Sequence, residues 1–296
     1  MERLPRPIAS QQNSEYSQRL LAAQARRYAD AKRIQEVRVA TVLLIAFVSM
    51  TSALSFPELR PAVGGAGGAL ALAWSVTSSR REKRCIHEAV MMQEEFDTHV
   101  FGLPWNGILA DHPTPTAIAA AAARYRGNRT KDWYPDMRNV PRPMDVLICQ
   151  RTNLGWSTST HRWYAVWTGI ALVALIAVGM AIAFGARLSL PDMLIAVAIP
   201  FLGPINELVE IIRANRESVT LKVGADAKAS ESWQRGLSNT ADVTLADCRS
   251  LQDLILSIRQ KNAHIPDWFD NLHRDHSQRT MQASADHMIT EVTGEV

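Results

Sequence analysis

Four long runs with few or no charged side chains constrain the fold of this chain more than any other feature. The runs cover residues 39–56, 62–79, 163–184 and 190–212. A helix needs about 20 mostly apolar residues to cross the roughly 30 Å hydrocarbon core of a bilayer. A short polar turn joins the first run to the second. Another joins the third to the fourth, where Ser189 and Pro191 suit a helix cap and first turn. The sequence therefore predicts an all-α integral membrane protein with four transmembrane helices in two hairpins.

Length and composition alone would suggest a soluble protein, because 296 residues with 47% hydrophobic side chains suit about two soluble domains. The distribution decides between the two interpretations. Nearly all charge lies between the apolar runs, whereas a soluble core spreads apolar residues periodically along amphipathic elements. Two buried helical hairpins in a soluble protein remain the alternative. The paired uncharged runs and the charge bias described next favour the membrane.

Basic residues predict the orientation, since loops rich in Lys and Arg stay on the cytosolic side. The turns after the first and third runs each carry one basic residue, Arg60 and Arg187. The opposite ends of the runs carry many: Arg26, Arg27, Lys32, Arg33, Arg38, Arg80, Arg81, Lys83, Arg84, Arg162, Arg213 and Arg216. We therefore expect a multi-pass protein of the inner (cytoplasmic) membrane, with both termini and the 80–162 segment in the cytosol.

The predicted organisation alternates membrane and cytosolic segments. In order these are 1–38, a cytosolic N-terminal helix; 39–79, transmembrane hairpin 1; 80–162, a cytosolic insert; 163–212, transmembrane hairpin 2; and 213–296, a cytosolic helical tail. The first segment is long and polar, which is the wrong layout for a cleaved leader. Within the insert, Thr116–Arg126 is expected to be a helix closed by Gly127. Within the tail, apolar residues from Leu245 to Ile258 form one helical stripe.

The middles of the four runs lack ionisable residues, which disfavours a proton-coupled pump or a voltage sensor. Glu207 lies 17 residues after Leu190, so about 26 Å along a helix and near the inner interface. Pro200 and Pro204 precede it, and proline kinks a helix. Pro200, Pro204 and Glu207 are therefore the candidate gate or pore residues. A static bend is the alternative interpretation.

The second run opens with glycines that allow close helix packing. Gly64, Gly65, Gly67 and Gly68 create a small-xxx-small spacing, which lets backbones approach. The packing could lie within one chain or between chains. Four helices of one chain enclose no obvious channel, so a pore would need a homo-oligomer.

Basic and aromatic residues are interleaved in the insert. From Arg124 to Arg151 there are seven basic residues against three acidic ones. Arginines beside aromatic rings suit a ligand that carries phosphates and bases. A folded insert with Trp133 in its core and arginines against lipid headgroups is the alternative. The candidate ligand-binding residues are Arg124, Arg126, Arg129, Lys131, Trp133, Arg151 and Asn153.

The sequence gives little support for catalysis, metal binding or nucleic-acid binding. Asp97 with His99, and His273 with His276, lack a third ligand at a metal-like spacing. The cysteines Cys85, Cys149 and Cys248 are scattered, which fits a reducing compartment. The tail holds ten basic and twelve acidic residues, so no DNA- or RNA-binding stripe is present. We expect no enzyme activity and no metal or cofactor.

The order of motifs resembles one known family. The motifs are Phe96-Asp97, Gly102-Leu103-Pro104-Trp105-Asn106, Lys131-Asp132-Trp133-Tyr134-Pro135, Ile148-Cys149-Gln150-Arg151 with Asn153 and Trp156, and Ile265-Pro266-Asp267-Trp268-Phe269. In this order, over nearly the whole chain, they resemble the SMODS-associated four-transmembrane effectors.

This resemblance implies a pore-forming effector of bacterial antiphage defence, triggered by a cyclic or linear oligonucleotide messenger that leads to abortive infection. It implies no catalytic or binding residue. Two other functions stay open. The chain could be a membrane-anchored scaffold or receptor that recruits a soluble partner through its helical tail, or a membrane-tethered enzyme acting on nucleotides.

Overall fold

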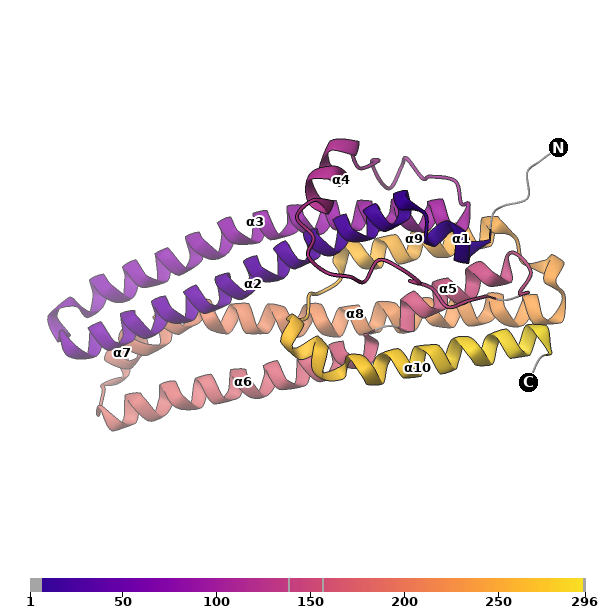
Figure 1. The fold of residues 1–296 in the computed structure, drawn as a ribbon. Helices are drawn as coiled ribbons and strands as arrows, with labels where there is room; N and C mark the ends of the chain where they lie inside the picture. Colours follow the sequence, from indigo (N-terminus) through magenta and orange to yellow (C-terminus); the bar gives the residue numbers. More distant parts are fainter. Residues whose placement is uncertain (1–6, 138, 156, 295–296) are drawn as a thin grey trace.

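The computed structural model describes residues 7–137, 139–155 and 157–294, and every regular element among them is a helix. Arg138, one of the seven basic residues of the insert, and Trp156, part of the fourth motif, lie outside the described residues. The elements run lengthwise as an elongated bundle, with α6 and the far ends of α2 and α3 at one end and the polar helices at the other (Figure 1). They are α1 Ile8–Gln12, α2 Glu15–Ser55, η1 Pro57–Leu59, α3 Arg60–Phe101, α4 Pro115–Ala122, α5 Met144–Gly155, α6 Thr158–Gly185, α7 Leu190–Met193, η2 Leu194–Ala198, α8 Ile199–Ser238, η3 Thr240–Asp242, α9 Leu245–Lys261 and α10 Asp267–Thr293.

The first hairpin consists of two uninterrupted helices of more than 40 residues, about 60 Å each at 1.5 Å per residue. Ser14 caps α2 by accepting a hydrogen bond from the Ser17 N–H. The helix then continues from the polar lead-in straight through the first apolar run, as predicted. Helix α3 ends at Phe101 and is capped by Gly102, whose φ of 67° is the left-handed conformation that glycine adopts without strain.

The second hairpin joins α6 to α8 through a short helical turn. Ser189 accepts a hydrogen bond from the Asp192 N–H, and Pro191 lies in the first turn of α7, which confirms the predicted cap. Between α7 and α8, residues Leu194–Ala198 form a π-helical turn, η2. The two hairpins are tied together at this end, where Arg60 forms an ion pair with Asp192 at 2.8 Å.

Among the described residues, three helical stretches are long and apolar enough to cross a membrane: Glu15–Ser55, Met144–Gly185, which comprises α5 and α6, and Leu190–Ser238. They contain the first, third and fourth predicted spans. The second predicted span, 62–79, forms the first half of α3 but is less hydrophobic, because four glycines and several serines dilute its leucines. Three candidate spans are thus found, and the four-span topology stays a prediction.

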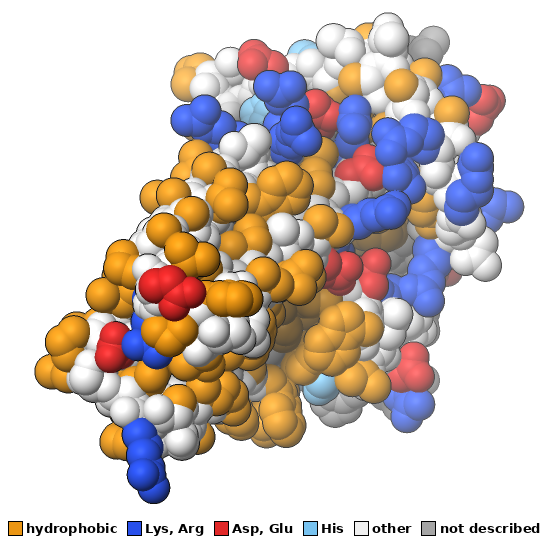
Figure 2. All heavy atoms as spheres, turned by 90° about the vertical axis from the view of Figure 1, so that its left-hand side faces the viewer, with side chains coloured by type: hydrophobic (Ala, Val, Ile, Leu, Met, Phe, Trp, Pro, Cys, Tyr) orange, Lys and Arg blue, Asp and Glu red, His pale blue; other side chains and the backbone are white. Residues whose placement is uncertain are grey.

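Two halves of the molecule differ in surface and composition. We define the apolar half as residues 39–79 and 163–212, and the polar half as the remaining described residues. Large apolar side chains of the apolar half are exposed, Leu72, Val173 and Phe184 among them. Figure 2 shows this end nearest the viewer, with hydrophobic side chains over most of its surface, while Lys, Arg, Asp and Glu gather on the more distant part. This is the surface of a membrane protein.

A large hydrophobic core is shared by the helices of the polar half. It includes Leu20 from α2, Phe96 from α3, Ile148 from α5, Trp233 from α8 and Ile255 from α9, all buried. The lead-in helix, the insert and the tail therefore fold against one another. The tail stripe lies on α9 as predicted, and its members from Cys248 to Ile258 face this core.

One predicted helix is shorter than expected. The alanine-rich helix was expected over Thr116–Arg126, but α4 ends at Ala122. Arg124, Arg126 and Gly127 instead lie in an extended loop. The Arg126 guanidinium donates to the Ala123 and Tyr125 carbonyls, which lie beyond the end of the helix.

Candidate functional site

Three charged side chains meet where the two halves join, one each from α2, α3 and α8. Arg38 donates from Nε to Glu207 Oε2 at 3.0 Å, and its Nη1 forms an ion pair with Glu82. The Ser75 hydroxyl donates to the other oxygen of Glu207. All three charged side chains are buried. One cation is shared by two buried carboxylates, so removing Arg38 would leave both carboxylates buried without a counter-charge. We call these residues the junction cluster.

The sequence carried a partial signal for the junction cluster. Glu207 was predicted near the inner interface, and in the structure it pairs with Arg38 where the two halves meet, while its depth in a bilayer stays a prediction. Arg38 was assigned only to the basic flank of the first span, and Glu82 was not singled out. Both are charged residues within a few positions of an uncharged run, at matching depth on neighbouring helices. Matching charged residues that lie at the same depth on neighbouring predicted helices would have predicted the cluster.

The candidate gate residues share one buried face of α8. Pro200, Pro204 and Glu207 are all buried and are spaced by four and three residues, so they lie along one side of the helix. Pro200 has no N–H to offer, and the π-helical turn η2 ends two residues before it. Next to Pro200, Phe201 packs edge-on against Phe47 of α2, with ring centroids 5.3 Å apart. The irregular part of α8 thus faces α2 and α3.

The glycines of α3 make this close packing feasible. A Cβ atom added at Gly64 would lie 2.7 Å from the Ile195 carbonyl oxygen of η2, which is backbone and cannot rotate away. Gly67 faces the Ser49 side chain, and Gly68 faces Ile199, whereas nothing lies within 4 Å of a Cβ at Gly65. The small-xxx-small surface therefore packs within one chain, against α2 and the start of α8.

Five of the seven candidate ligand-binding residues lie in the loop after α4. Arg124, Arg126, Arg129, Lys131 and Trp133 are exposed. Arg124 forms an ion pair with Asp30 of α2 at 3.2 Å, and Trp133 packs edge-on against Phe96 with centroids 6.3 Å apart. This loop is a basic and aromatic surface with most of its cations turned to solvent.

The other two candidates lie on α5 and are half-buried. Arg151 forms an ion pair with Asp226 of α8 at 3.2 Å, and Asn153 donates to the Tyr134 hydroxyl at 2.8 Å. Both have partners within the chain, so the structure does not gather all seven residues at one place.

A buried polar network, which the sequence analysis did not predict, holds the polar half together. Its hub is Asp97 of α3, which is fully buried. Asp97 accepts hydrogen bonds from Arg259 at 2.6 Å, from the Tyr134 hydroxyl at 2.6 Å and from Gln252 at 3.1 Å. Nearby, Glu94 accepts from Gln252 at 2.8 Å and pairs with Arg249 at 2.7 Å. The family motifs around Asp97, Tyr134 and Asn153 therefore converge on one structural network.

The environment of this network shifts its titratable groups in directions that fit structural roles. Burial, followed by the charge of Asp97, raises the pKa of Tyr134 well above its ordinary value, so the phenol stays a proton donor. Burial, reinforced by Asp97, also raises the pKa of Glu94, against the opposing hydrogen bonds from Gln252 and Arg249. Burial likewise raises the pKa of the Cys149 thiol, which makes it unreactive.

The residues considered for metal or acid–base chemistry are dispersed. Asp97 is ion-paired with Arg259. The His99 ring lies 2.9 Å from the Gln11 amide and packs against Tyr16. His273 stacks on Phe269, and the side chain of His276 lies outside the described residues. Within 7–137, 139–155 and 157–294, no three His, Cys, Asp or Glu side chains are arranged to hold a metal ion.

Comparison with known proteins gives one family and one curated relative. Residues 6–288 match the SMODS-associating 4TM effector domain. A protein of Bacillus cereus (strain VD146), described as a probable CBASS effector molecule, is 24% identical over 272 residues, which cover 88% of this chain and 91% of that protein. No solved structure matches this chain.

Proposed function

The chain belongs to the SMODS-associating 4TM effector family, as its motifs indicated, and from this premise we propose that it is a signal-gated membrane effector of bacterial antiphage defence. A cyclic oligonucleotide messenger binds the polar half, the apolar half rearranges, and the cell's own inner membrane leaks. The observation that carries the proposal is the continuity of α2, α3 and α8, each of which passes from one half into the other without a break.

Continuity matters because an α-helix transmits displacement along its axis. With about 60 Å of helix crossing both halves, a small tilt at the polar end moves the apolar end by several ångströms. In Figure 1, α2 and α3 extend from the end that holds α7 towards the polar helices, and α8 extends from near α7 to the opposite end. Along these three helices, whose residues are all described, no loop separates the apolar half from the polar half. Binding energy in the polar half therefore reaches the apolar half directly.

In this proposal the polar half lies in the cytosol, together with both termini. The basic residues that flank the apolar half on this side support that orientation, against single basic residues in the two opposite turns. The messenger is made in the cytosol, so a cytosolic polar half can meet it. The exposed loop containing Arg124, Arg126, Arg129, Lys131 and Trp133 is the proposed docking surface, because its solvent-exposed cations and indole suit phosphates and bases.

The junction cluster, with Pro200 and Pro204, is the proposed gate. It ties three helices at one level, and its two carboxylates repel each other unless Arg38 stays between them. A tilt of α2 would withdraw Arg38 and drive α3 and α8 apart. The irregular η2 turn beside the prolines gives α8 a place to bend.

The leak itself requires several copies of the chain. Helix α6 supports this view, since it packs mainly on α8 and exposes Trp167, Ile170, Val173 and Phe184. Such a face can contact lipid in one state and another copy in the next. Oligomerisation on messenger binding is thus part of the proposal.

A liposome experiment tests the proposal. The purified full chain is inserted into vesicles that hold a self-quenching dye, and cyclic oligonucleotides are added on both sides to serve either orientation. We expect one messenger to release the dye, and the Arg38→Gln variant to leak without it because Glu82 and Glu207 then repel. Arg19→Gln, an exposed partner of Glu15, is the matched control and should stay closed. Vesicles that retain dye with every messenger, although alkaline extraction shows inserted protein, would refute the proposal.

A scaffold is the second candidate function, and fewer observations support it. The α9 stripe is covered by the chain's own core, but Trp268 and Leu272 at the start of α10 are exposed. Deleting residues 213–296 would remove part of the shared core and unfold the polar half. The double variant Trp268→Ser, Leu272→Ser is the cleaner test. A scaffold that binds its partner through these side chains would lose its antiphage effect in cells, whereas messenger-dependent dye release from vesicles would remain.

A further inference from the structure

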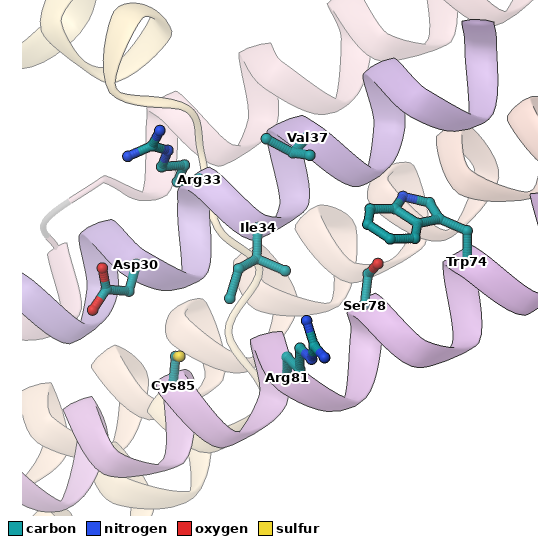
Figure 3. Close-up of a pocket in the computed structure, with 8 residues that line it drawn as sticks. All are labelled: Asp30, Arg33, Ile34, Val37, Trp74, Ser78, Arg81 and Cys85. Carbon is teal, nitrogen blue, oxygen red and sulfur yellow. The ribbon is translucent and has the colours of Figure 1, made fainter. Parts of the chain in front are cut away.

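A groove runs between α2 and α3 at the level where the apolar half gives way to the polar half. Its volume is about 330 Å³, near the lower end for small-molecule sites. Figure 3 shows its lining side chains, with Trp74 at one end, Asp30 and Cys85 at the other, and Arg81 between the helices. The lining residues are Asp30, Arg33, Ile34, Val37, Trp74, Ser78, Arg81 and Cys85.

The polar part of the groove is positively charged. Arg33 and Arg81 are exposed, and within the described ranges neither has a hydrogen-bond or ion-pair partner. Asp30 is the one acidic residue of the lining, and it is already engaged by Arg26 at 2.5 Å and by Arg124 at 3.2 Å. Two arginines thus remain available for an anion, and arginine forks match phosphate oxygens.

The opposite part of the groove is apolar and faces outward. Val37 is 47% exposed and Trp74 is 38% exposed. Exposed apolar side chains in one groove indicate contact with a partner or a membrane and not with water alone. Val37 lies two residues before the first apolar run, and Trp74 lies near the end of the second. This is the depth at which tryptophan indoles and lipid headgroups meet in a membrane protein.

We propose that this groove binds an anionic phospholipid, with the headgroup phosphate between Arg33 and Arg81 and the first acyl carbons against Val37 and Trp74. A free oligonucleotide fits less well, since Ile34 and Val37 offer no donor or acceptor to the edge of a base and lie next to the first apolar run. The site lies between the two helices that meet in the junction cluster through Arg38 and Glu82. A lipid held there links α2 to α3 beside that cluster.

The test uses the full chain in mild detergent with phosphatidylglycerol brominated on its acyl chains, because bromine quenches nearby tryptophan. The chain has eight tryptophans, so the signal of Trp74 is the difference between the wild type and a Trp74→Phe variant. We expect this difference signal to fall with brominated phosphatidylglycerol and to change little with brominated phosphatidylcholine, which has no net charge.

Charge variants give the decisive comparison. Arg33→Gln with Arg81→Gln should weaken phosphatidylglycerol binding about 30-fold, as expected for two cations worth roughly 1 kcal/mol each at a lipid surface. Arg80→Gln with Arg162→Gln removes two exposed arginines beside the apolar half but outside the groove, and it should leave the Trp74 signal unchanged. Circular dichroism checks that all variants are folded.

Three results would overturn the proposal: equal quenching by the two lipids, equal weakening by the two double variants, or displacement of phosphatidylglycerol by a cyclic dinucleotide. The last would make the groove a messenger site. Inorganic phosphate at the same concentration should not displace the lipid. Because the assay reads binding and not leakage, its result is independent of whether the chain forms a pore.

Discussion

The two halves of the molecule are built from the same three long helices but are held together in opposite ways. In the polar half, a buried network of charged and amide side chains around Asp97 locks α3, α5 and α9, and one large core fills the space between them. In the apolar half, glycines bring α3 against η2, and α6 packs mainly on α8. The polar half is therefore held by specific buried polar contacts as well as by its core, whereas the apolar half depends mainly on close packing of small side chains.

The largest expected effect is on the polar half. Asp97→Asn leaves the Arg259 guanidinium buried without its counter-charge, which should lower the free energy of unfolding by about 3–5 kcal/mol. Thermal unfolding in detergent measures this loss. Adding Arg259→Gln to the same chain should restore part of the stability, and a fully additive double variant would contradict the charge-pair explanation. Glu15→Gln, in an exposed pair, should change stability by less than about 1 kcal/mol.

A pH-dependent effect should also be confined to the polar half. His264 is buried beside the Tyr28 ring, and burial, followed by the charge of Lys32, lowers its pKa to about 4. The unfolded chain binds this proton near pH 6.5, so the neutral imidazole favours the folded state above that pH. This contribution is lost as pH falls from 6.5 to 4, and it amounts to roughly 3 kcal/mol.

Unfolding of the wild type and of His264→Gln across this pH range isolates the effect. The stability difference between the two should change with pH, whereas His112→Gln, an exposed histidine, should follow the wild type. Parallel curves for the wild type and His264→Gln would show that the imidazole titrates normally.

In the apolar half a smaller effect is expected, and it depends on backbone contact. Gly64→Ala places a Cβ 2.7 Å from the Ile195 carbonyl oxygen, so α3 must move away from η2 at a cost of about 1–3 kcal/mol. Gly65→Ala meets nothing within 4 Å and should be neutral or stabilising by up to about 1 kcal/mol, as alanine favours helices. Equal melting temperatures for the two variants would mean that α3 does not touch η2.

The smallest effect tests one bond of the network. Tyr134→Phe keeps the ring stacked on Phe96, with centroids 6.0 Å apart, and removes only the hydroxyl that links Asp97 to Asn153. We expect a loss of about 1–2 kcal/mol in unfolding free energy. A loss as large as that of Asp97→Asn would show that the hydroxyl, and not the Arg259 pair, is the main support of Asp97.

Local features of the fold could be predicted from the sequence because they depend on neighbouring residues. The lead-in helix, the Ser189 cap and the α9 stripe are set by nearby side chains, and the structure confirms them. The shared core and the Asp97–Arg259 pair could not be predicted, because they join residues 162 positions apart. Nothing local distinguishes Arg259 from any exposed arginine on a helix.

The candidate site was predicted in part for the same reason. Glu207 stood out because it interrupts an apolar run, and it does join the junction cluster. The cations of the insert stood out only as a group, and the group divides in the structure: Arg151 pairs with Asp226, while Arg129 and Lys131 stay exposed. Basic composition predicts a charged surface, but it does not tell which cations the fold itself neutralises.

The π-helical turn η2 stores one residue more than an α-helical turn would need. An α-helix advances about 100° per residue, so absorbing that residue into regular α-helix would rotate all of α8 below it by roughly a quarter turn, with an axial change of only about 1.5 Å. Glu207 would then leave the side facing Arg38, whereas the shared core, which holds Trp233 near the other end of α8, opposes the same rotation. The extra residue of η2 therefore sets which face of α8 meets α2 and α3 at the level of Arg38.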